Sequence, residues 1–311
     1  MLHPLRDLLL FLVLVAALVV FWYMLVRAGA TKLLKRRPPD PPDPPSNYGL
    51  AFEEVHFTSR DDVKLFGWWI PADNAIGTIV LCHGQNGSMD GDTKQAVPLH
   101  EAGFNVFMFD FRAHGRSEGE YVTMGMYEKE DLLGVMDYLD TERGIVDVGV
   151  LGFSMGAATT LITAALSDHI CAIVSDSSFG RLKLTLRAAL NQRGVPMFFA
   201  RPYVDGIIAA ASWRTEGRID QTDPIRWTVH IGVRPILFIQ GEEDCYVSIA
   251  DLDRMASLAK GPVEFWIVEG VGHRGAYAAD PVEYNRRVIN WFKRYLPKPT
   301  PVAAQVESEQ V

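Results

Sequence analysis

The chain has 311 residues, of which 48% are hydrophobic and 22% are charged, and these ordinary globular values suit one large α/β domain or two smaller ones. The formal net charge is −8 and the body of the chain has no stripe rich in lysine and arginine, so no nucleic-acid partner is expected. Cys82, Cys171 and Cys245 form no CxxC pair and no Cys/His cluster of zinc spacing, so we expect neither a disulfide framework nor a zinc site.

The N-terminus carries an unbroken apolar run from Leu8 to Val26. A membrane-spanning helix needs about 20 such residues. A cleaved signal peptide is the alternative, because Ala28-Gly29-Ala30 resembles a cleavage site. The run is longer than the usual apolar core of a signal peptide, and Arg6 is the one basic side chain before it. Residues 1–30 are therefore predicted to be a transmembrane anchor.

The basic side chains around this run give a weaker indication of orientation. Five lysines and arginines follow it before residue 38, whereas Arg6 precedes it. The positive-inside rule then places the rest of the chain on the cytoplasmic side, although a long folded domain can override that bias.

The next segment, residues 31–49, is rich in proline, favours polyproline II and is predicted to be a semi-rigid linker. A proline-rich recognition ligand is the alternative interpretation.

From residue 50 onward, short apolar runs alternate with segments of helical pattern. The expected strands are 53–59, 63–72, 77–84, 104–112, 148–154, 170–176, 234–241 and 263–270, and the expected helices are 92–102, 125–141, 155–167, 248–260 and 281–295. The first two strands flank "RDD" and read as an antiparallel hairpin. The rest predicts a mainly parallel sheet with helices on both faces, and ligands gather at the carboxyl ends of such strands.

Two further segments interrupt or follow this alternation. Residues 178–230 contain no clear strand and are predicted to be helices that form a small lid or one wall of a substrate site. Residues 297–311 are polar and aperiodic, and are predicted to be a disordered tail. The globular domain is thus expected to span residues 50–296.

The segment "GFSMG" at 152–156 places Ser154 between two glycines. A strand is expected before it and a helix after it, which is the context that makes G-x-S-x-G a nucleophile elbow. The glycines permit the tight packing that such a strained turn requires. A helix-capping serine would explain Ser154 but not both glycines. Ser154 is therefore the predicted nucleophile.

A serine hydroxyl is a weak nucleophile and needs a base that is itself oriented by an acid. His273 follows the last expected strand and is the candidate base, with His230 as the alternative. The acidic cluster after the preceding strand offers Asp244 as the candidate acid. Asp176, which ends another strand, is the alternative acid.

An oxyanion hole needs two backbone N–H groups. Met155, the residue after the nucleophile, is expected to supply one, and Gln85, in the loop after the strand at 77–84, the other. His83 is expected to brace that loop by hydrogen bonding. The segment 110–119 is interpreted as a polar turn near the site, held by an Asp–Arg contact.

These motifs, in this order, resemble the α/β-hydrolase family. The matching segments are "HGQNG" at 83–87, "DFRAHGRS" at 110–117, "GFSMG" at 152–156, "GEEDCYV" at 241–247 and "GVGH" at 270–273. Within the family the chain resembles the membrane-anchored, Bem46-like serine hydrolases related to the S33 serine aminopeptidases, to which "SDSSFGRL" at 175–182 is similar. Ala113 stands where a glycine is common in such turns.

The expected function is hydrolysis of a carboxylic ester or thioester through Ser154, His273 and Asp244, with no metal and no organic cofactor. The anchor indicates a lipid-like or membrane-proximal acyl substrate. An aminopeptidase-like serine peptidase is the enzymatic alternative. A non-catalytic, membrane-tethered scaffold with the same fold is the alternative from a different class.

Overall fold

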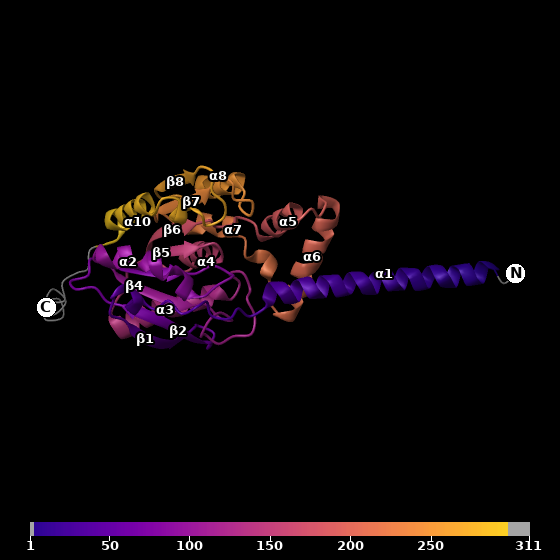
Figure 1. The fold of residues 1–311 in the computed structure, drawn as a ribbon, viewed down its shortest axis with the longest axis horizontal. Helices are drawn as coiled ribbons and strands as arrows, with labels where there is room; N and C mark the ends of the chain where they lie inside the picture. Colours follow the sequence, from indigo (N-terminus) through magenta and orange to yellow (C-terminus); the bar gives the residue numbers. More distant parts are fainter. Residues whose placement is uncertain (1–2, 298–311) are drawn as a thin grey trace.

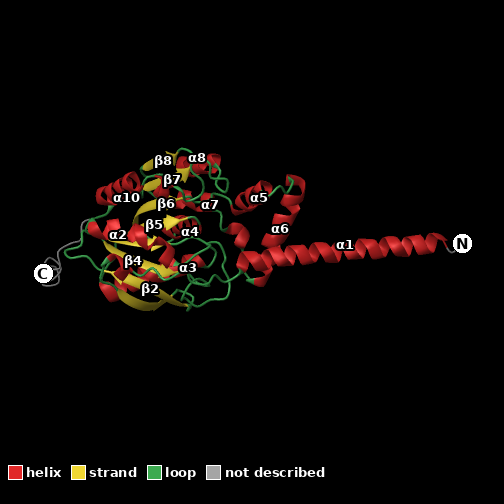
Figure 2. Ribbon diagram, viewed as in Figure 1, coloured by secondary structure: helices red, strands yellow, loops and turns green. Residues whose placement is uncertain are grey.

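A computed structural model describes residues 3–297 of the chain. It begins with a long helix, α1 (His3–Leu34), and continues into a domain in which strands and helices alternate (Figures 1 and 2). The strands are β1 (Glu53–Thr58), β2 (Lys64–Ile70), β3 (Thr78–Cys82), β4 (Asn105–Asp110), β5 (Val148–Phe153), β6 (Ile170–Asp176), β7 (Ile236–Gly241) and β8 (Val263–Val268). The other helices are α2 (Thr93–Glu101), α3 (Glu128–Arg143), α4 (Met155–Ala164), α5 (Leu182–Gln192), α6 (Met197–Arg214), α7 (Pro224–Trp227), α8 (Ile249–Leu258), α9 (Ala276–Ala279) and α10 (Pro281–Tyr295).

The strands form one eight-stranded sheet in the order β1-β2-β4-β3-β5-β6-β7-β8. β1 and β2 are an antiparallel hairpin, and β2 also pairs antiparallel with β4. All pairs from β4 to β8 are parallel, so the carboxyl ends of these strands share one edge. Every residue of β3, β5 and β7 is buried, as expected for strands covered on both faces. The predicted α/β fold with a mainly parallel sheet is confirmed.

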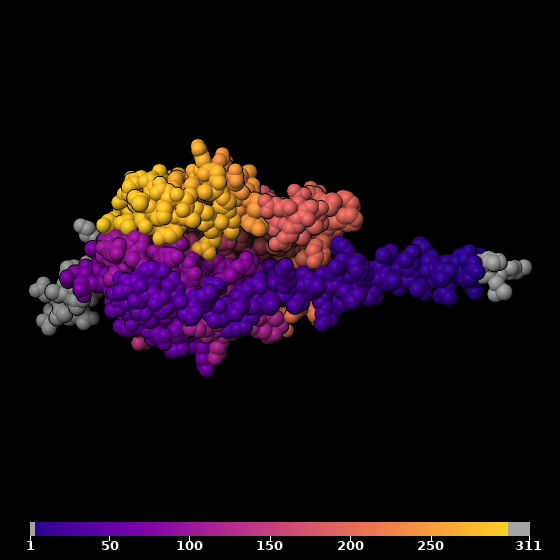
Figure 3. Space-filling model, viewed as in Figure 1, coloured from indigo at the N-terminus to yellow at the C-terminus, as the bar shows by residue number. Residues whose placement is uncertain are grey.

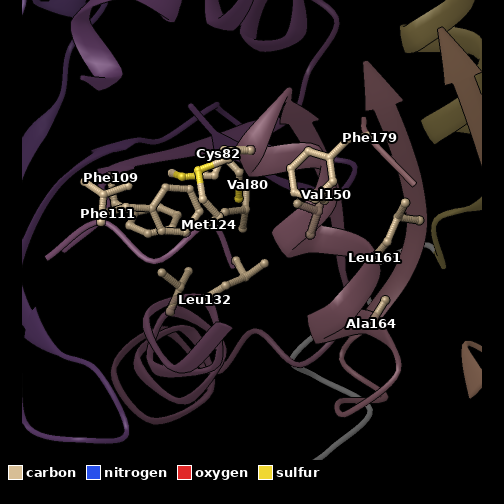
Figure 4. Packing of buried hydrophobic residues seen from close by; sticks show 14 of the residues in the cluster. Val80, Cys82, Phe109, Phe111, Met124, Leu132, Val150, Leu161, Ala164 and Phe179 are labelled. Carbon is tan, nitrogen blue, oxygen red and sulfur yellow. The ribbon is translucent and has the colours of Figure 1, made fainter. Parts of the chain in front are cut away.

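Two buried apolar clusters lie on the two faces of the sheet. The first joins the sheet to α3, α4 and α8 and also includes side chains of α1 and α6. Figure 4 shows part of this cluster, where Phe109 and Phe111 pack close to Met124 and Leu132. The second cluster joins the opposite face to α2 and α10. Helices thus cover both faces of the sheet.

Helix α1 divides into an exposed part and a part packed on the domain. Residues 4–25 expose their side chains, whereas Val26, Ala30, Leu33 and Leu34 are buried. Figures 1 and 3 show the exposed part projecting as a rod from one end of the domain, beside α6. The segment Pro4–Leu34 is long and apolar enough to cross a membrane, by length and composition. A membrane anchor and a signal sequence both meet this description.

The segment after α1 is bound to the domain surface. Arg36 donates a 2.7 Å hydrogen bond to the Ser117 carbonyl, and the Asp40 N–H donates to Ser88 Oγ at 2.9 Å. These contacts hold the segment predicted to be a semi-rigid linker, residues 31–49, against the loops at the sheet edge. The tail expected at 297–311 lies, from residue 298, outside the described residues.

The interval at 178–230 is helical, and its two longest helices, α5 and α6, pack on each other and α6 on α1. In α6, Val204, Ile207 and Ala211 are buried. The Trp22 and Tyr203 rings meet edge to face with centroids 6.0 Å apart. This insertion therefore joins the end of the domain from which α1 projects (Figure 1).

Candidate active site

Ser154 lies on a sharp turn between β5 and α4. Its φ of 51° and ψ of −111° lie outside the regions that non-glycine residues favour. Such a conformation costs about 1–3 kcal/mol and persists where the surroundings enforce it. Here the Ser154 N–H donates a 2.8 Å hydrogen bond to the Asp176 carbonyl of the neighbouring strand. The turn points the hydroxyl away from the sheet at its carboxyl edge.

The glycines beside Ser154 are required by close backbone packing. A Cβ atom on Gly156 would lie 2.1 Å from the carbonyl oxygen of Cys82 in β3. A Cβ atom on Gly152 would lie 2.6 Å from the Cα of Ala157. Both obstacles are main-chain atoms, so neither position accepts a side chain without moving β3 or α4. The sequence pattern therefore has a steric cause.

The side chains of Ser154, His273 and Asp244 meet at the carboxyl edge of the sheet. His273 Nε2 is 2.8 Å from Ser154 Oγ, and His273 Nδ1 is 2.6 Å from Asp244 Oδ2. The Asp244 side chain is fully buried, whereas the His273 side chain is 24% exposed. A carboxylate can only accept, so Nδ1 carries the proton and Nε2 is free to accept from the serine hydroxyl. This tautomer is the one a general base requires.

Asp244 is itself held in place by the turn that follows β7. Its second oxygen, Oδ1, accepts a hydrogen bond from the Tyr246 N–H at 2.8 Å. The Tyr246 ring packs edge to face on His273, with centroids 5.1 Å apart. The carboxylate and the imidazole are therefore oriented by the same short loop.

The two alternative residues lie apart from this chain of hydrogen bonds. The Asp176 carboxylate accepts from the hydroxyls of Ser177 and Tyr284, at 2.8 and 2.9 Å. Burial raises the pKa of Asp176. His230 ends a short 3₁₀ turn and is exposed. Neither side chain makes a hydrogen bond to Ser154 or His273 within residues 3–297.

The backbone of the loop after β3 runs beside Ser154. A Cβ atom on Gly84 would lie 3.6 Å from the Cβ of Ser154, so the next residue, Gln85, is a neighbour of the elbow. Met155 is the first residue of α4. Helix N-termini present N–H groups without intrahelical partners. In the described part of the chain, no protein acceptor binds the N–H of Gln85 or Met155.

Two buried histidines hold this loop. His83 Nε2 accepts from the Phe111 N–H at 2.9 Å, and Nδ1 donates to the Gly84 carbonyl at 2.8 Å. His114 Nε2 lies 2.9 Å from the Gln85 carbonyl. Burial lowers the pKa of both imidazoles to about 4, so both are neutral near pH 7. His83 thus braces the loop as expected, and His114 is a second brace that the sequence did not reveal.

The turn after β4 is polar and contains an Asp–Arg contact, as expected: Arg116 Nε lies 3.4 Å from Asp110 Oδ2. Arg112 pairs with Asp131, at 2.6 Å, and with Asp61, rather than with Asp110. The Asp110 carboxylate also accepts from the N–H groups of Met89 and Arg116, each at 2.9 Å. Arg112 is buried, and the sequence could not name Asp61 or Asp131 because both come from elsewhere in the chain.

The backbone conformation of Ala113 explains why a glycine is common at its position, because its φ is 56°, in the left-handed region.

Arg274 is a further residue near the site that the sequence analysis did not identify. Its guanidinium pairs with Asp92 and lies 4.6 Å from the centre of the Phe153 ring. Burial alone would lower the pKa of Arg274, but the charges of Asp92 and Asp176 outweigh it and raise that pKa. Arg274 therefore connects the loop that carries His273 to Asp92 and to Phe153 at the end of β5.

A cavity of about 620 Å³ is lined by Ser154 and His273 and also by residues of α1, α5 and α6. The volume suits a small-molecule ligand. Among residues 3–297, no group of three or more His, Cys, Asp or Glu side chains is arranged to hold a metal ion.

A family model described as "alpha/beta hydrolase fold" matches residues 77–206. The Bacillus subtilis protein YqkD is 28% identical over 236 residues, which are 73% of this chain and 74% of YqkD. YfhR from Escherichia coli strain K12 is 29% identical over 238 residues, 73% of this chain and 75% of YfhR. Both relatives are named as uncharacterized proteins.

A solved structure of the Pyrococcus furiosus esterase Pf2001 is 27% identical and has a TM-score of 0.72, covering 85% of this chain and 99% of that protein. The narrower resemblance to Bem46-like proteins stays a prediction. The sheet order, the family model and this esterase structure together identify the chain as a hydrolase with the α/β-hydrolase fold.

Proposed function

We propose that this hydrolase cleaves a carboxylic ester or thioester through an acyl-enzyme formed on Ser154. The observation that carries the proposal is the unbroken chain of hydrogen bonds from Asp244 through His273 to Ser154, at 2.6 and 2.8 Å. A serine of this kind is activated when an oriented base can remove its proton during attack. The esterase activity named for Pf2001 supports the same class of reaction.

In the first half of the reaction, Ser154 Oγ bonds to the acyl carbon while its proton passes to His273 Nε2. The tetrahedral intermediate collapses, the bond to the leaving group breaks, and His273 gives the proton to the departing alcohol or thiol. In the second half, His273 deprotonates water, which attacks the acyl-enzyme. The carboxylic acid leaves, and the proton returns to Ser154. Asp244 stabilises the imidazolium formed in each half.

The developing negative charge on the acyl oxygen needs donors that are already in place. In this proposal the N–H groups of Gln85 and Met155 fill that role. His114 and His83 fix the loop that carries Gln85, and α4 supplies its N-terminus. No metal or organic cofactor takes part in the proposed steps.

A fluorophosphonate probe tests this proposal, because it reacts with an activated serine and not with an ordinary hydroxyl. We expect the full chain to be labelled at Ser154, as located by peptide mass spectrometry, and Ser154→Ala to lose labelling. Ser177→Ala is the matched control, since Ser177 is a buried hydroxyl beside the site that touches Asp176 rather than His273. A wild-type chain that stays unlabelled, or a Ser154→Ala variant that is labelled equally, contradicts the mechanism.

The same preparation separates the alternatives to an esterase. We expect turnover of p-nitrophenyl esters or acyl-CoA thioesters to exceed turnover of aminoacyl arylamides. The reverse order would favour the aminopeptidase-like alternative. Folded protein with neither turnover nor labelling would favour the non-catalytic scaffold.

We also propose that α1 anchors the enzyme in a membrane with the domain on the cytoplasmic side. The apolar exposed surface of residues 4–25 and the basic residues after the apolar run support this orientation. Protease added to intact cells should leave residues 50–296 undigested until the membrane is permeabilised. Digestion from outside would reverse the orientation, and a mature N-terminus near residue 31 would identify a signal peptide instead.

A further inference from the structure

The end of α1 forms part of the wall of the cavity that holds Ser154. Gly29, Lys32 and Leu33 line this cavity together with residues of α5 and α6. The helix that we propose to anchor the protein therefore also borders the place where substrate binds. Figures 1 and 3 show that α5 and α6 lie at the end of the domain from which α1 projects.

Specific contacts fix this wall. The Arg214 guanidinium donates to Thr31 Oγ1 at 2.8 Å, and the Tyr203 hydroxyl donates to the Leu25 carbonyl at 3.3 Å. Gly29 lies so close to α6 that a Cβ atom would be 2.6 Å from Ile207 Cδ1. α1 and α6 thus pack as one unit, which makes the cavity wall a defined surface.

One side of the cavity is apolar. The apolar side chains of the lining include Leu33, Phe179, Leu186, Leu190, Val204 and Ile207. These side chains come from α1, the loop after β6, α5 and α6, and all are buried or half-buried. A surface of this kind suits a hydrocarbon chain, because it offers apolar contact and no hydrogen-bond partner.

Four lysine and arginine side chains line the cavity. Arg274 is paired with Asp92, and the other three are Lys32, Arg37 and Arg193. Among residues 3–297, none of these three has a carboxylate oxygen within 4.0 Å. Arg37 is half-buried, its Nε is shielded from solvent without a hydrogen-bond partner, and one terminal nitrogen donates to the Lys32 carbonyl at 3.3 Å. Burial lowers the pKa of Arg37, because no carboxylate offsets its desolvation.

Two carboxylates line the same cavity. Asp92 pairs with Arg274, whereas Asp40 accepts from the Ser88 N–H at 2.8 Å and has no cationic partner within 4.0 Å among residues 3–297. Three cations without an ion-pair partner against one such carboxylate still leave an excess of positive charge in the cavity. An anionic ligand would satisfy it.

Arg37 also lies next to the proposed oxyanion loop. Its N–H donates to the Ala113 carbonyl at 2.8 Å, and its carbonyl accepts from the Gly115 N–H at 3.1 Å. The residue between these two, His114, contacts the Gln85 carbonyl at 2.9 Å. The backbone of Arg37 is therefore held beside the segment that contacts the loop of Gln85, the proposed oxyanion donor.

We propose that this cavity binds an anionic amphiphilic ester, in which a hydrocarbon chain and a phosphate or carboxylate group flank the scissile bond. The chain lies on the apolar lining, and the anion binds Arg37, with Lys32 and Arg193 adding charge. A guanidinium suits such an anion because it can donate two parallel hydrogen bonds. The inference rests on the proposed serine hydrolase function and names its substrate class.

Three esters with the same acyl chain test the proposal: 1-lauroylglycerol, which is neutral, 1-lauroylglycerol 3-phosphate and 3-lauroylglycerate. With the full chain in neutral detergent micelles, we expect kcat/KM for one of the anionic esters to exceed that for the neutral ester at least tenfold. Whichever anionic ester is preferred identifies phosphate or carboxylate as the recognised group. Equal kcat/KM for all three esters overturns the proposal.

Variants then locate the anion. Arg37→Gln should lower the ratio of anionic to neutral kcat/KM by about 10- to 100-fold, the range for losing a hydrogen bond to a charged group. Arg37→Lys should restore part of that ratio. The double variant Lys32→Gln/Arg193→Gln should lower it in the same direction, and because both side chains are exposed the fold should not suffer. Lys35→Gln removes the same charge outside the cavity lining and should leave the ratio unchanged.

Failure of the anion-site proposal can be distinguished from failure of the proposed hydrolase function. A labelled and active wild type whose ratio does not respond to Arg37→Gln or to the double variant overturns the anion site alone. A protein that is neither labelled at Ser154 nor active on any ester overturns both proposals. Melting temperatures of all variants, measured in the same detergent, show whether a lost ratio reflects lost folding.

Discussion

Replacing Asp244 by asparagine is expected to lower kcat for ester hydrolysis by about four orders of magnitude, as removal of the charge does in other serine triads. Asp244 Oδ1 accepts from the Tyr246 N–H, so an asparagine would keep its carbonyl oxygen on that donor. Its NH₂ group would then face His273 Nδ1 and force that nitrogen to accept. The proton would move to Nε2, which could no longer take the proton of Ser154. Steady-state kinetics on a p-nitrophenyl ester measures this loss.

Asp176→Asn is the matched control for Asp244→Asn. Asp176 is also a buried carboxylate at a strand end, but it accepts from Ser177 and Tyr284 and does not contact His273. An asparagine can keep an acceptor for one of these hydroxyls, so we expect kcat to stay within about tenfold of wild type. If Asp176→Asn lost as much activity as we expect for Asp244→Asn, and Asp244→Asn stayed active, the acid would be Asp176.

The elements of the fold were predictable because their signals are local. Continuous apolar runs such as Ile79 to Cys82 indicate strands covered on both faces, and β3, β5 and β7 are buried throughout. The alternation of these runs with helical segments then implies parallel strands. The sheet order itself, with β4 between β2 and β3, is a long-range property that no single segment encodes.

The same distinction applies to the candidate site. Ser154, Asp244 and His273 could be proposed as a group because each follows a strand whose carboxyl end is recognisable, and ends of parallel strands meet at one edge. Arg112 and Arg274 find their partners in distant segments, and nothing near either residue in the sequence identifies those partners. The contacts of the proline-rich segment escaped for a related reason: its composition sets a local conformation but does not reveal that Asp40 binds Ser88.

Replacing Gly156 by alanine is expected to destabilise the domain by more than about 3 kcal/mol, because overpacking a rigid core costs about 1–3 kcal/mol even where side chains can yield. Here the new Cβ atom would lie 2.1 Å from the Cys82 carbonyl oxygen and 2.6 Å from that of His83, and both are main-chain atoms. Relief requires α4 to move away from β3, which would also displace Ser154. For a domain of this size the melting temperature should fall by about 10 °C. Thermal unfolding followed by circular dichroism, in detergent, measures the change.

Gly272→Ala provides the comparison, because a Cβ atom there meets nothing within 4 Å and the backbone φ is ordinary. We expect its melting temperature to stay within about 2 °C of wild type, since substitutions without a steric or backbone conflict usually change stability by about 0.5 kcal/mol or less. Equal melting temperatures for Gly156→Ala and wild type would show that α4 can yield, and the need for glycine at the elbow would then have another cause. A large loss for Gly156→Ala alone ties the second glycine of the motif to one carbonyl oxygen of β3, so that the pattern around Ser154 reflects helix–strand distance rather than chemistry.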